Sequence, residues 1–274
     1  MKKFFLIIWF LFIPGFAFPA ARTDVSVDRK TVLNFFYSLA FSTASSQYVQ
    51  SSKPSYSNTE GMAIEMYIYL PEIAVATDRW YSEGSSSSNT PFISFHWMTI
   101  SPRVIQITKR DDLSSSENLS FANIPLNLNC WQHVVVSDDV DNLAMSVFLN
   151  GVQEKKPYSN GTGTMTLNQS ALAALWRMTV QNYSDIHIAL LRAYSRPLEI
   201  SEAIELYRHG IVPDAVAKEY LFSEGPGGST LADTSGNGYD GTLISTPDWT
   251  TSVPSKNRTE SALRTDIGST RIDI

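Results

Sequence analysis

Three oxygen-bearing residues in a glycine-rich stretch near the C-terminus are the best candidates for metal chemistry. Asp233, Asn237 and Asp240 lie in the segment LADTSGNGYDG. Calcium binds about six to eight oxygen ligands, and the neighbouring glycines would let backbone carbonyls turn toward an ion. The segment therefore predicts a structural Ca²⁺ site. A turn in which these side chains bond only to their own backbone accounts for the same residues equally well.

Aromatic side chains in predicted loops form the second candidate group. Sugars stack their apolar faces on aromatic rings, while nearby polar groups hydrogen-bond the hydroxyls. We predict ligand-binding roles for four aromatics: Trp80, Tyr81, Tyr158 and Tyr239. The Trp80–Tyr81 pair is preferred because it adjoins a serine-rich loop, and Tyr183 is a further loop aromatic. Most aromatics of a β-sandwich lie in its core, so three tryptophans are expected to be buried: Trp97, Trp131 and Trp176.

Groups that perform acid–base or nucleophilic catalysis do not gather at catalytic spacings. The four histidines are scattered, without the i, i+2 or i, i+4 pairs of a zinc site. There is no G-x-S-x-G segment to nominate a nucleophile. Glu65, in the strand-like run AIEMYIY, has no second acid in that run. We therefore predict that the protein is not an enzyme.

The elements that must position these residues are mostly strands. The run from Trp131 to Gly151 alternates apolar and polar residues on either side of an acidic turn, and Asn150-Gly151 suits a tight hairpin. Further alternating runs follow one another at short intervals from Ser38 onward, separated by Ser, Asn, Gly and Pro clusters. Glu199 to His209 is the one believable helix, with Gly210 as its stop signal. The pattern predicts an all-β sandwich with one short helix.

The two ends of the chain are expected to lie outside the sandwich. Residues 1–21 combine two lysines, an apolar stretch of about ten residues and small residues, which is typical of a secretory signal peptide. Residues 22–249 would form the single domain, and residues 250–274 are polar, like a tail or arm. No later stretch is apolar enough to span a membrane. We therefore predict a secreted or cell-surface protein.

Net charge limits the classes of expected partner, and cysteine content limits the sources of stability. The formal net charge is −6, and no basic stripe is present, which excludes nucleic acid as an expected partner. Cys130 is the only cysteine, so no internal disulfide is available and stability must come from core burial, with or without a metal ion. A glycan or an extracellular protein remains the expected partner, with self-association as a further expectation.

Four segments in this order carry a family resemblance: FSTASSQYVQ, GMAIEMYIYLP, WQHVVVSDDVDNLAMSVFLNGV and IALLRAYSRPLEISEAIELY. Together they resemble the laminin-G/pentraxin-like group of the concanavalin A-like lectin/glucanase superfamily. The segment YLFSEGPGGSTLADTSGNGYDGTL is similar to a motif that usually precedes the first of these strands. Here it follows the helix. The resemblance implies a concanavalin A-like jelly-roll β-sandwich, either with a circularly shifted order or with a second, truncated module at the C-terminus.

The resemblance also bears on the candidate sites. It implies that Glu65 and His133 are structural, hydrogen-bonded sheet residues. Glucanases of this fold carry E-x-D-x-x-E on one strand, a run that this chain lacks. Related modules often bind structural calcium near the glycine-rich loop, but the acidic pair expected after Ile188 is replaced by Ala189-Leu190.

Three functions are consistent with these observations. The first is a secreted, non-catalytic, lectin-like binding or adhesion module that recognises extracellular glycans or proteins. The second is a structural subunit of an extracellular fibre, sheath or surface assembly, joined through strand edges or the C-terminal arm. A glycoside hydrolase is a distant third, since the carboxylate pair is missing.

Overall fold

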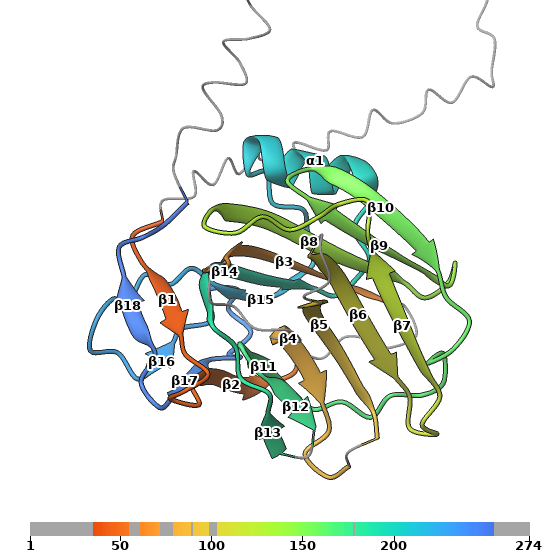
Figure 1. Ribbon diagram of the computed structural model, residues 1–274, viewed down its shortest axis with the longest axis horizontal. Coiled ribbons are helices and arrows are strands. Elements are labelled where there is room, and N and C mark those ends of the chain that lie inside the picture. The colour runs from red at the N-terminus through yellow and green to blue at the C-terminus, as the bar shows by residue number, and fades with distance from the viewer. Residues whose placement is uncertain are drawn as a thin grey trace, which may run out of the picture.

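The computed structural model describes residues 35–54, 61–71, 79–88, 90–98, 103–177 and 179–254. The described chain is a sandwich of two antiparallel sheets with a helix on one outer face (Figure 1). The all-β fold predicted from the sequence is therefore confirmed. The proposed signal peptide and residues 255–274 of the proposed tail lie outside the described residues. The helix found among the described residues is too short to cross a membrane.

The first sheet carries the helix and is called sheet A. Its strands run in the order β10 (Val152–Pro157), β9 (Ala144–Leu149), β8 (Trp131–Asp139), β3 (Met62–Tyr69), β14 (Ile186–Tyr194), β1 (Ser38–Phe41) and β18 (Asp248–Thr250). A further strand, β15 (Val216–Tyr220), pairs with β14. The central pairs β14–β3 and β3–β8 are the longest ladders of this sheet.

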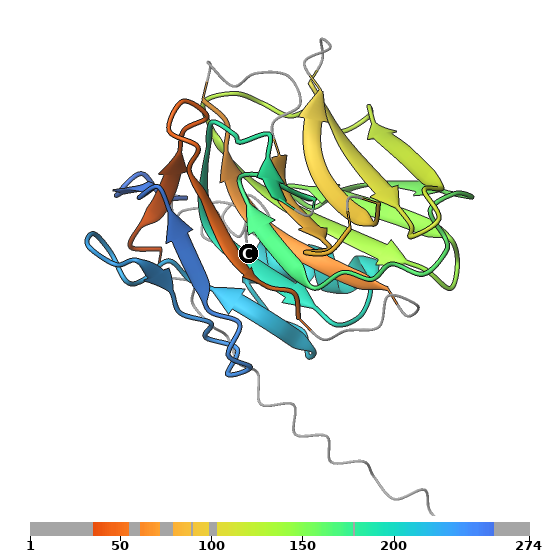
Figure 2. The same cartoon turned by 90° about the horizontal axis from the view of Figure 1, so that it is seen from below.

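The second sheet is called sheet B and lies on the side away from the helix (Figure 2). Its order is β16 (Thr230–Leu231), β17 (Gly241–Ile244), β2 (Tyr48–Ser52), β11 (Gln169–Leu172), β4 (Arg79–Gly84), β5 (Phe92–Met98), β6 (Val104–Arg110) and β7 (Ser116–Phe121). A small hairpin of β12 (Leu175–Arg177) and β13 (Thr179–Gln181) lies beside β4 and β5.

The main core fills the space between the sheets. In β3, Ile64, Met66 and Ile68 point inward and are at most 2% exposed. Inward residues of sheet B include Phe95 and Ile107, which oppose each other across β5 and β6. Burying such aliphatic and aromatic side chains is the main favourable term in folding. Strand parity therefore decides which residues remain for the two outer faces.

The hairpin predicted from Trp131 to Gly151 is present as β8 and β9. Asn150 and Gly151 form the tight turn that joins β9 to β10, and they adopt the positive φ values of 51° and 80° that this turn requires. A side chain at Gly151 would place its Cβ 2.7 Å from Cδ1 of Tyr207, so the turn also needs glycine for the close approach of the helix. The hairpin thus fixes where the helix can sit.

The helix, α1 (Ile200–His209), lies close to its predicted bounds. Glu199 is its N-cap and forms a capping box with Glu202, and Gly210 ends it at φ 63°. Ala203 and Leu206 pack on the outer face of sheet A, against a cluster that includes Val135. This helix covers only part of that face (Figure 1).

The C-terminal segment completes both sheets. Strand β17 pairs with β2, β18 pairs with β1, and β15 pairs with β14. Of the two arrangements considered from the sequence, the structure shows the shifted order within one sandwich. The first strands after Ser38 are β1 and β2, which are joined by a turn. Strand β4 contains Trp80 and Tyr81, which were predicted to lie in a loop, because pairing with neighbouring strands outweighs polar composition.

Candidate functional site

A row of partly exposed aromatic rings crosses the part of sheet A that α1 leaves open. His187 of β14, Tyr69 of β3 and Trp131 of β8 are direct cross-strand partners. The ring centroids of His187 and Tyr69 are 5.1 Å apart, and those of Tyr69 and Trp131 are 5.7 Å apart. All three side chains are intermediate in exposure. We call this row the aromatic platform.

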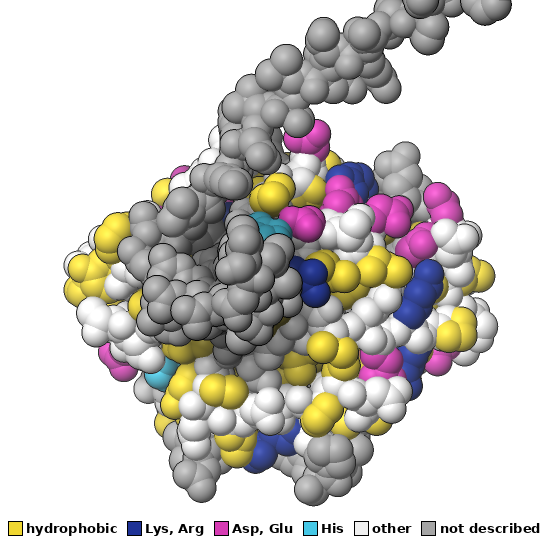
Figure 3. Space-filling model, turned by 90° about the horizontal axis from the view of Figure 1, so that it is seen from above, with side chains coloured by type: hydrophobic (Ala, Val, Ile, Leu, Met, Phe, Trp, Pro, Cys, Tyr) yellow, Lys and Arg dark blue, Asp and Glu magenta, His cyan; other side chains and the backbone are white. Residues whose placement is uncertain are grey.

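Strand parity explains why these rings face outward. Ile68 and Ile188 are fully buried between the sheets, so their neighbours Tyr69 and His187 point to the opposite face. In β8, Val134 and Val136 belong to the core, which turns Trp131 and His133 outward. The more aliphatic set of each strand enters the core and leaves the aromatic set outside. Figure 3 looks onto the α1 side, where hydrophobic and acidic side chains lie side by side.

A second set of rings connects the platform to the helix. Tyr67 packs on His133 with ring centroids 4.7 Å apart, and His133 stacks on Tyr207 of α1 at 5.8 Å. Phe35 meets Tyr67 edge-on at 5.0 Å. His133 is fully buried, whereas Tyr67 and Tyr207 are partly exposed. The end of α1 therefore borders the platform on one side.

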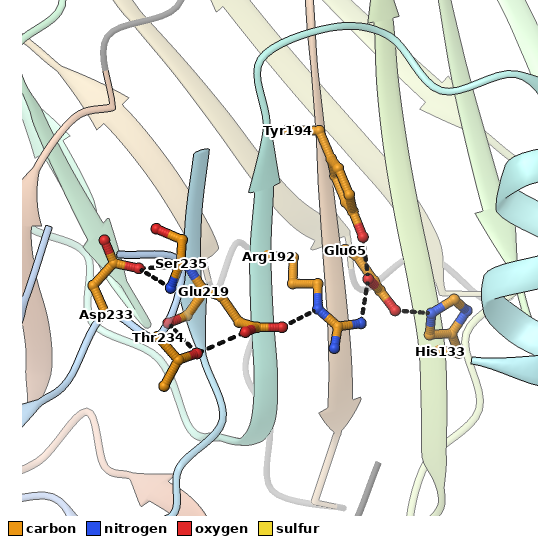
Figure 4. Close-up of polar contacts among 8 residues, drawn as sticks. All are labelled: Glu65, His133, Arg192, Tyr194, Glu219, Asp233, Thr234 and Ser235. Atoms are coloured by element: carbon orange, nitrogen blue, oxygen red, sulfur yellow. Dashed lines mark hydrogen bonds and ion pairs between the residues drawn. The ribbon is translucent and has the colours of Figure 1, made fainter. Parts of the chain in front are cut away.

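A buried ionic network lies beside these rings and holds His133 (Figure 4). One Glu65 oxygen is 2.9 Å from Nε2 of His133. The other accepts hydrogen bonds from Arg192 at 3.1 Å and from the Tyr194 hydroxyl at 2.7 Å. Nε of Arg192 also donates to Glu219, at 2.5 Å. Glu65 and Arg192 are both fully buried. The network thus ties together four strands of sheet A: β8, β3, β14 and β15.

The charge state of Glu65 follows from these partners. Burial would raise its pKa, but the charge of Arg192 and the hydrogen bonds from His133 and Tyr194 outweigh burial and lower the pKa to about 2. The carboxylate is therefore ionised at neutral pH and has both oxygens occupied. The interpretation of Glu65 and His133 as hydrogen-bonded sheet residues is confirmed.

Three of the predicted ligand-binding aromatics lie in the core, so that prediction is wrong for them. Trp80 and Tyr81 are each 1% exposed and belong to strand β4 instead of a loop. Trp80 stacks on Trp97, and the Tyr81 hydroxyl donates to Glu83 at 2.6 Å. Tyr158 is 5% exposed. A sugar cannot stack on rings that the protein itself covers.

Tyr158 has a different role. Its hydroxyl donates to Oδ1 of Asp138 at 2.8 Å and lies 3.0 Å from Nζ of Lys109. Lys109 and Asp138 form a buried ion pair with atoms 2.7 Å apart, which links β6 of sheet B to β8 of sheet A. Because a buried charge needs a partner, this cluster stabilises the contact between the sheets only as a complete set.

Tyr239 and Tyr183 remain partly exposed, on other parts of the surface. The Tyr239 carbonyl accepts a hydrogen bond from the Tyr220 hydroxyl at 2.5 Å, so its backbone is held in place. Tyr183 packs on Tyr48 with ring centroids 5.8 Å apart, against the small cluster around Trp176. Trp97 and Trp176 are buried as expected, whereas Trp131 is only partly buried. The expectation for Trp131 is therefore corrected.

The residues predicted to bind calcium direct their polar atoms to the protein. Asp233 Oδ1 accepts from the backbone amides of Glu219 and Ser235, and Oδ2 accepts from that of Tyr239. Asn237 uses its side-chain NH₂ to donate to the carbonyl of Ala217.

Asp240 completes this loop, with its Oδ1 accepting from the amide of Asp233. In the part of the chain that the structure describes, no three His, Cys, Asp or Glu side chains are grouped to hold a metal ion. The hydrogen bonds from backbone amides to the carboxylates of Asp233 and Asp240 are those of the self-bonded turn that the sequence left open as the alternative.

The outer face of sheet B offers a contrasting polar surface. Nε2 of His96 lies 2.7 Å from Oε1 of Gln106, whose NH₂ donates to Ser120 at 3.0 Å. Thr108 donates to Asn118 at 2.7 Å. Burial and the charge of Arg79 lower the pKa of His96 to about 4, so its ring is neutral at pH 7. These polar groups bind one another, which leaves the aromatic platform as the better candidate for a ligand.

The alternation of residues in one strand is a sequence signal for the platform. Tyr67 and Tyr69 alternate with Met66 and Ile68 in one strand. The aliphatic set of such a strand prefers the core, so the alternate tyrosines belong outside. Placing Trp131 beside them required the pairing of β3 with β8, which no local pattern contains.

Comparison with solved structures shows the same architecture at low sequence identity. The heptameric SAP-like pentraxin from Limulus polyphemus aligns with a TM-score of 0.55 and 13% identity, over 78% of this chain and 94% of that chain. A "putative carbohydrate binding protein" from Bacteroides ovatus ATCC 8483 aligns with a TM-score of 0.56 and 13% identity. That alignment covers 82% of this chain and 63% of the other. At such identities, the likeness concerns the fold alone.

No curated protein matches the sequence. One family model does, Laminin_G_3, described as "Concanavalin A-like lectin/glucanases superfamily", and it matches residues 43–203. That span runs from the turn after β1 into α1 and includes β3 and β8, which carry Tyr69 and Trp131. The chain thus belongs to the concanavalin A-like lectin/glucanase superfamily.

Proposed function

We propose that this protein is a non-catalytic, lectin-like module that binds carbohydrate outside the cell through the aromatic platform. The observation that carries the proposal is the cross-strand row of His187, Tyr69 and Trp131, whose rings lie outside the core and are partly exposed. Aromatic faces suit the C–H faces of sugars, and hydroxylated ligands gain further from nearby polar groups. The Bacteroides ovatus structure, named for carbohydrate binding, supports the same class of ligand.

The decisive experiment compares ring removals on the two outer faces. Trp131→Ala and Tyr69→Ala should each weaken binding to a glycan found on an array by about two- to tenfold, since an aromatic contact contributes about 0.5–1.5 kcal/mol beyond area burial. Tyr183→Ala is the matched control, because it removes a partly exposed loop ring that packs on Tyr48 of sheet B. Calorimetry gives the affinities, and circular dichroism checks folding. Equal binding by all four proteins would refute the platform as the site.

The absence of catalysis is part of the proposal. Its support is the state of Glu65, which is ionised, fully buried and engaged by three partners, and so is unsuited to protonate a glycosidic oxygen. The expected result is no release of reducing sugar from any glycan that the protein binds. Hydrolysis that disappears in Glu65→Gln would overturn this part of the proposal and leave the binding site in place.

The location outside the cell rests on the sequence of residues 1–21. Expression in a secreting host should yield a mature protein whose N-terminus lies near residue 22. N-terminal sequencing of the exported protein tests this. An uncleaved, intracellular product would contradict the proposed location.

A further inference from the structure

We propose that Lys109 and Asp138 react with each other in the folded protein and form an isopeptide bond, an amide between their side chains. The two residues are 29 positions apart in the sequence and belong to opposite sheets, Lys109 to β6 and Asp138 to β8. Nζ of Lys109 lies 2.7 Å from Oδ2 of Asp138. The bond ties the two sheets together covalently and does not depend on the aromatic platform or its ligand.

The pair lies in the interior of the sandwich, from which water is largely excluded. Lys109 follows Ile107 on the inward side of β6, and Asp138 follows Val136 on the inward side of β8. Lys109 and Asp138 are each 3% exposed. The loop after β10 packs directly on Lys109, since a side chain at Gly161 would place its Cβ 2.8 Å from the Lys109 backbone oxygen. Groups held together in this way react intramolecularly, with an effective concentration of about 10⁵–10⁸ M.

The hydrogen bonds of the pair suit the neutral forms that react. In the described residues, Nζ of Lys109 meets two acceptors, Oδ2 of Asp138 and the hydroxyl of Tyr158. An ammonium has three hydrogens to donate, whereas a neutral amine has two and keeps a lone pair. Within the same part of the chain, the Asp138 carboxyl accepts from these two groups alone. The equally buried Asp111 accepts from three backbone amides, so Asp138 has less support as a carboxylate.

The reaction balances without any other reactant. A proton moves from Nζ of Lys109 along the hydrogen bond to Oδ2, which leaves a neutral amine beside a carboxylic acid. The lone pair of Nζ then attacks Cγ of Asp138, and the electron pair of the C=O bond moves to Oδ1. Tyr158 takes a proton from Nζ and gives its own to Oδ1, so the intermediate is neutral and carries two hydroxyls. One hydroxyl takes the proton of the other and leaves as water, while the carbonyl re-forms.

Tyr158 is placed to relay that proton. Its hydroxyl lies 2.8 Å from Oδ1 of Asp138 and 3.0 Å from Nζ of Lys109, so it touches both reacting groups. Burial and the charge of Asp138 raise the pKa of this hydroxyl, so it carries its proton at neutral pH. Nζ also lies 4.6 Å from the centre of the Tyr158 ring, which holds the amine in place. Tyr158 is thus the catalytic residue of this reaction.

Two other lysines each lack one part of this arrangement. Nζ of Lys218 is fully buried but donates to the hydroxyls of Ser51 and Ser170, which are not electrophilic. Lys156 meets the carboxylate of Glu154 at 3.3 Å, but the Lys156 side chain is 34% exposed. Water has access to that pair and competes for both groups. The chemistry therefore favours Lys109 over either of them.

The test is the intact mass of the mature protein under denaturing conditions, with the N-terminus known from sequencing. The wild-type protein should be lighter than its sequence by one water molecule. In a tryptic digest, a branched peptide should join residues 104–110 to residues 111–155, because trypsin does not cut after an acylated lysine. A wild-type protein with its full sequence mass would overturn the proposal and leave Lys109 and Asp138 as an ion pair.

Variants locate the lost water. Lys109→Met and Asp138→Ala should each have their full sequence mass. Lys218→Met is the matched control and should keep the deficit, because it removes a different buried lysine. A deficit that persists in Lys109→Met would place the loss elsewhere, as in a cyclic imide at Asp240-Gly241, and would overturn the proposal. The wild-type branched peptide decides between these outcomes where a variant fails to fold.

A further variant tests the proton relay. Tyr158→Phe should slow bond formation by about 10²- to 10⁴-fold, measured as the fraction of protein that has lost water at increasing times after purification. Bond formation in Tyr158→Phe at the wild-type rate would overturn the role of Tyr158.

Discussion

Lys218 gives a sharp test of how the two sheets are joined. Its side chain is fully buried in β15 of sheet A, and Nζ donates to Ser170 at 2.7 Å and to Ser51 at 3.1 Å, both in sheet B. Burial lowers its pKa to about 8, despite the nearby charges of Glu83 and Asp233. The folded protein therefore holds this proton less tightly than the unfolded chain, in which lysine titrates near 10.4.

The sign of the pH effect follows from that difference. Below about pH 8 both states carry the proton, and the cost of burying the charge is fully present. As the pH rises from about 8 toward 10.4, the folded state loses the proton first, so the free energy of unfolding increases. At about pH 9.5 the expected gain over pH 7 is on the order of 2 kcal/mol, since one pKa unit corresponds to about 1.4 kcal/mol.

Urea denaturation at pH 7 and at about pH 9.5 measures this gain. Lys218→Met is the control variant, because methionine fills a similar volume without a titrating group, and its stability should lack the rise. Buried tyrosines such as Tyr220, whose pKa burial raises, act in the opposite direction above about pH 10, so the assay stays below that value. A wild-type profile that parallels that of Lys218→Met would refute the reasoning.

Three further predictions concern the network, the core and the glycine-rich loop. Glu65→Gln should lower the free energy of unfolding at pH 7 by about 3 kcal/mol, because Arg192 loses a buried partner. Since the pKa of Glu65 is about 2, the wild-type protein should lose this contribution as the pH falls from about 4.5 to 2. A stability difference between wild type and Glu65→Gln that stays constant over this pH range in acid denaturation would contradict the claim. Trp80→Ala should cost about 3–5 kcal/mol in urea without changing the affinity of the folded protein for a glycan, and a selective loss of affinity would restore Trp80 as a ligand contact. EDTA should leave the thermal midpoint unchanged, because Asp233 bonds to backbone amides, whereas a fall reversed by Ca²⁺ would show a metal site.

The sequence by itself determined the class of fold and much of its local structure. Period-2 alternation in β3, β8 and β9 indicated strands, Asn150-Gly151 indicated the tight turn, and Gly210 marked the end of the helix. These features depend on residues close together in the chain, where turn chemistry and periodicity are readable. The absence of a carboxylate pair along the strand of Glu65 could also be predicted, because it too depends on residues close together in the chain.

Only the tertiary structure decided which aromatics are accessible. Trp80 lies in a polar region of the sequence, yet β4 pairs with β5 and β11 and becomes a central strand. Trp131 was predicted to be buried, but Val134 and Val136 of the same strand face the space between the sheets and turn Trp131 to the outer face. Whether Tyr69, Trp131 and His187 meet depends on the register of three strands far apart in the chain. Burial and register are settled by packing across the whole sandwich, which no local pattern records.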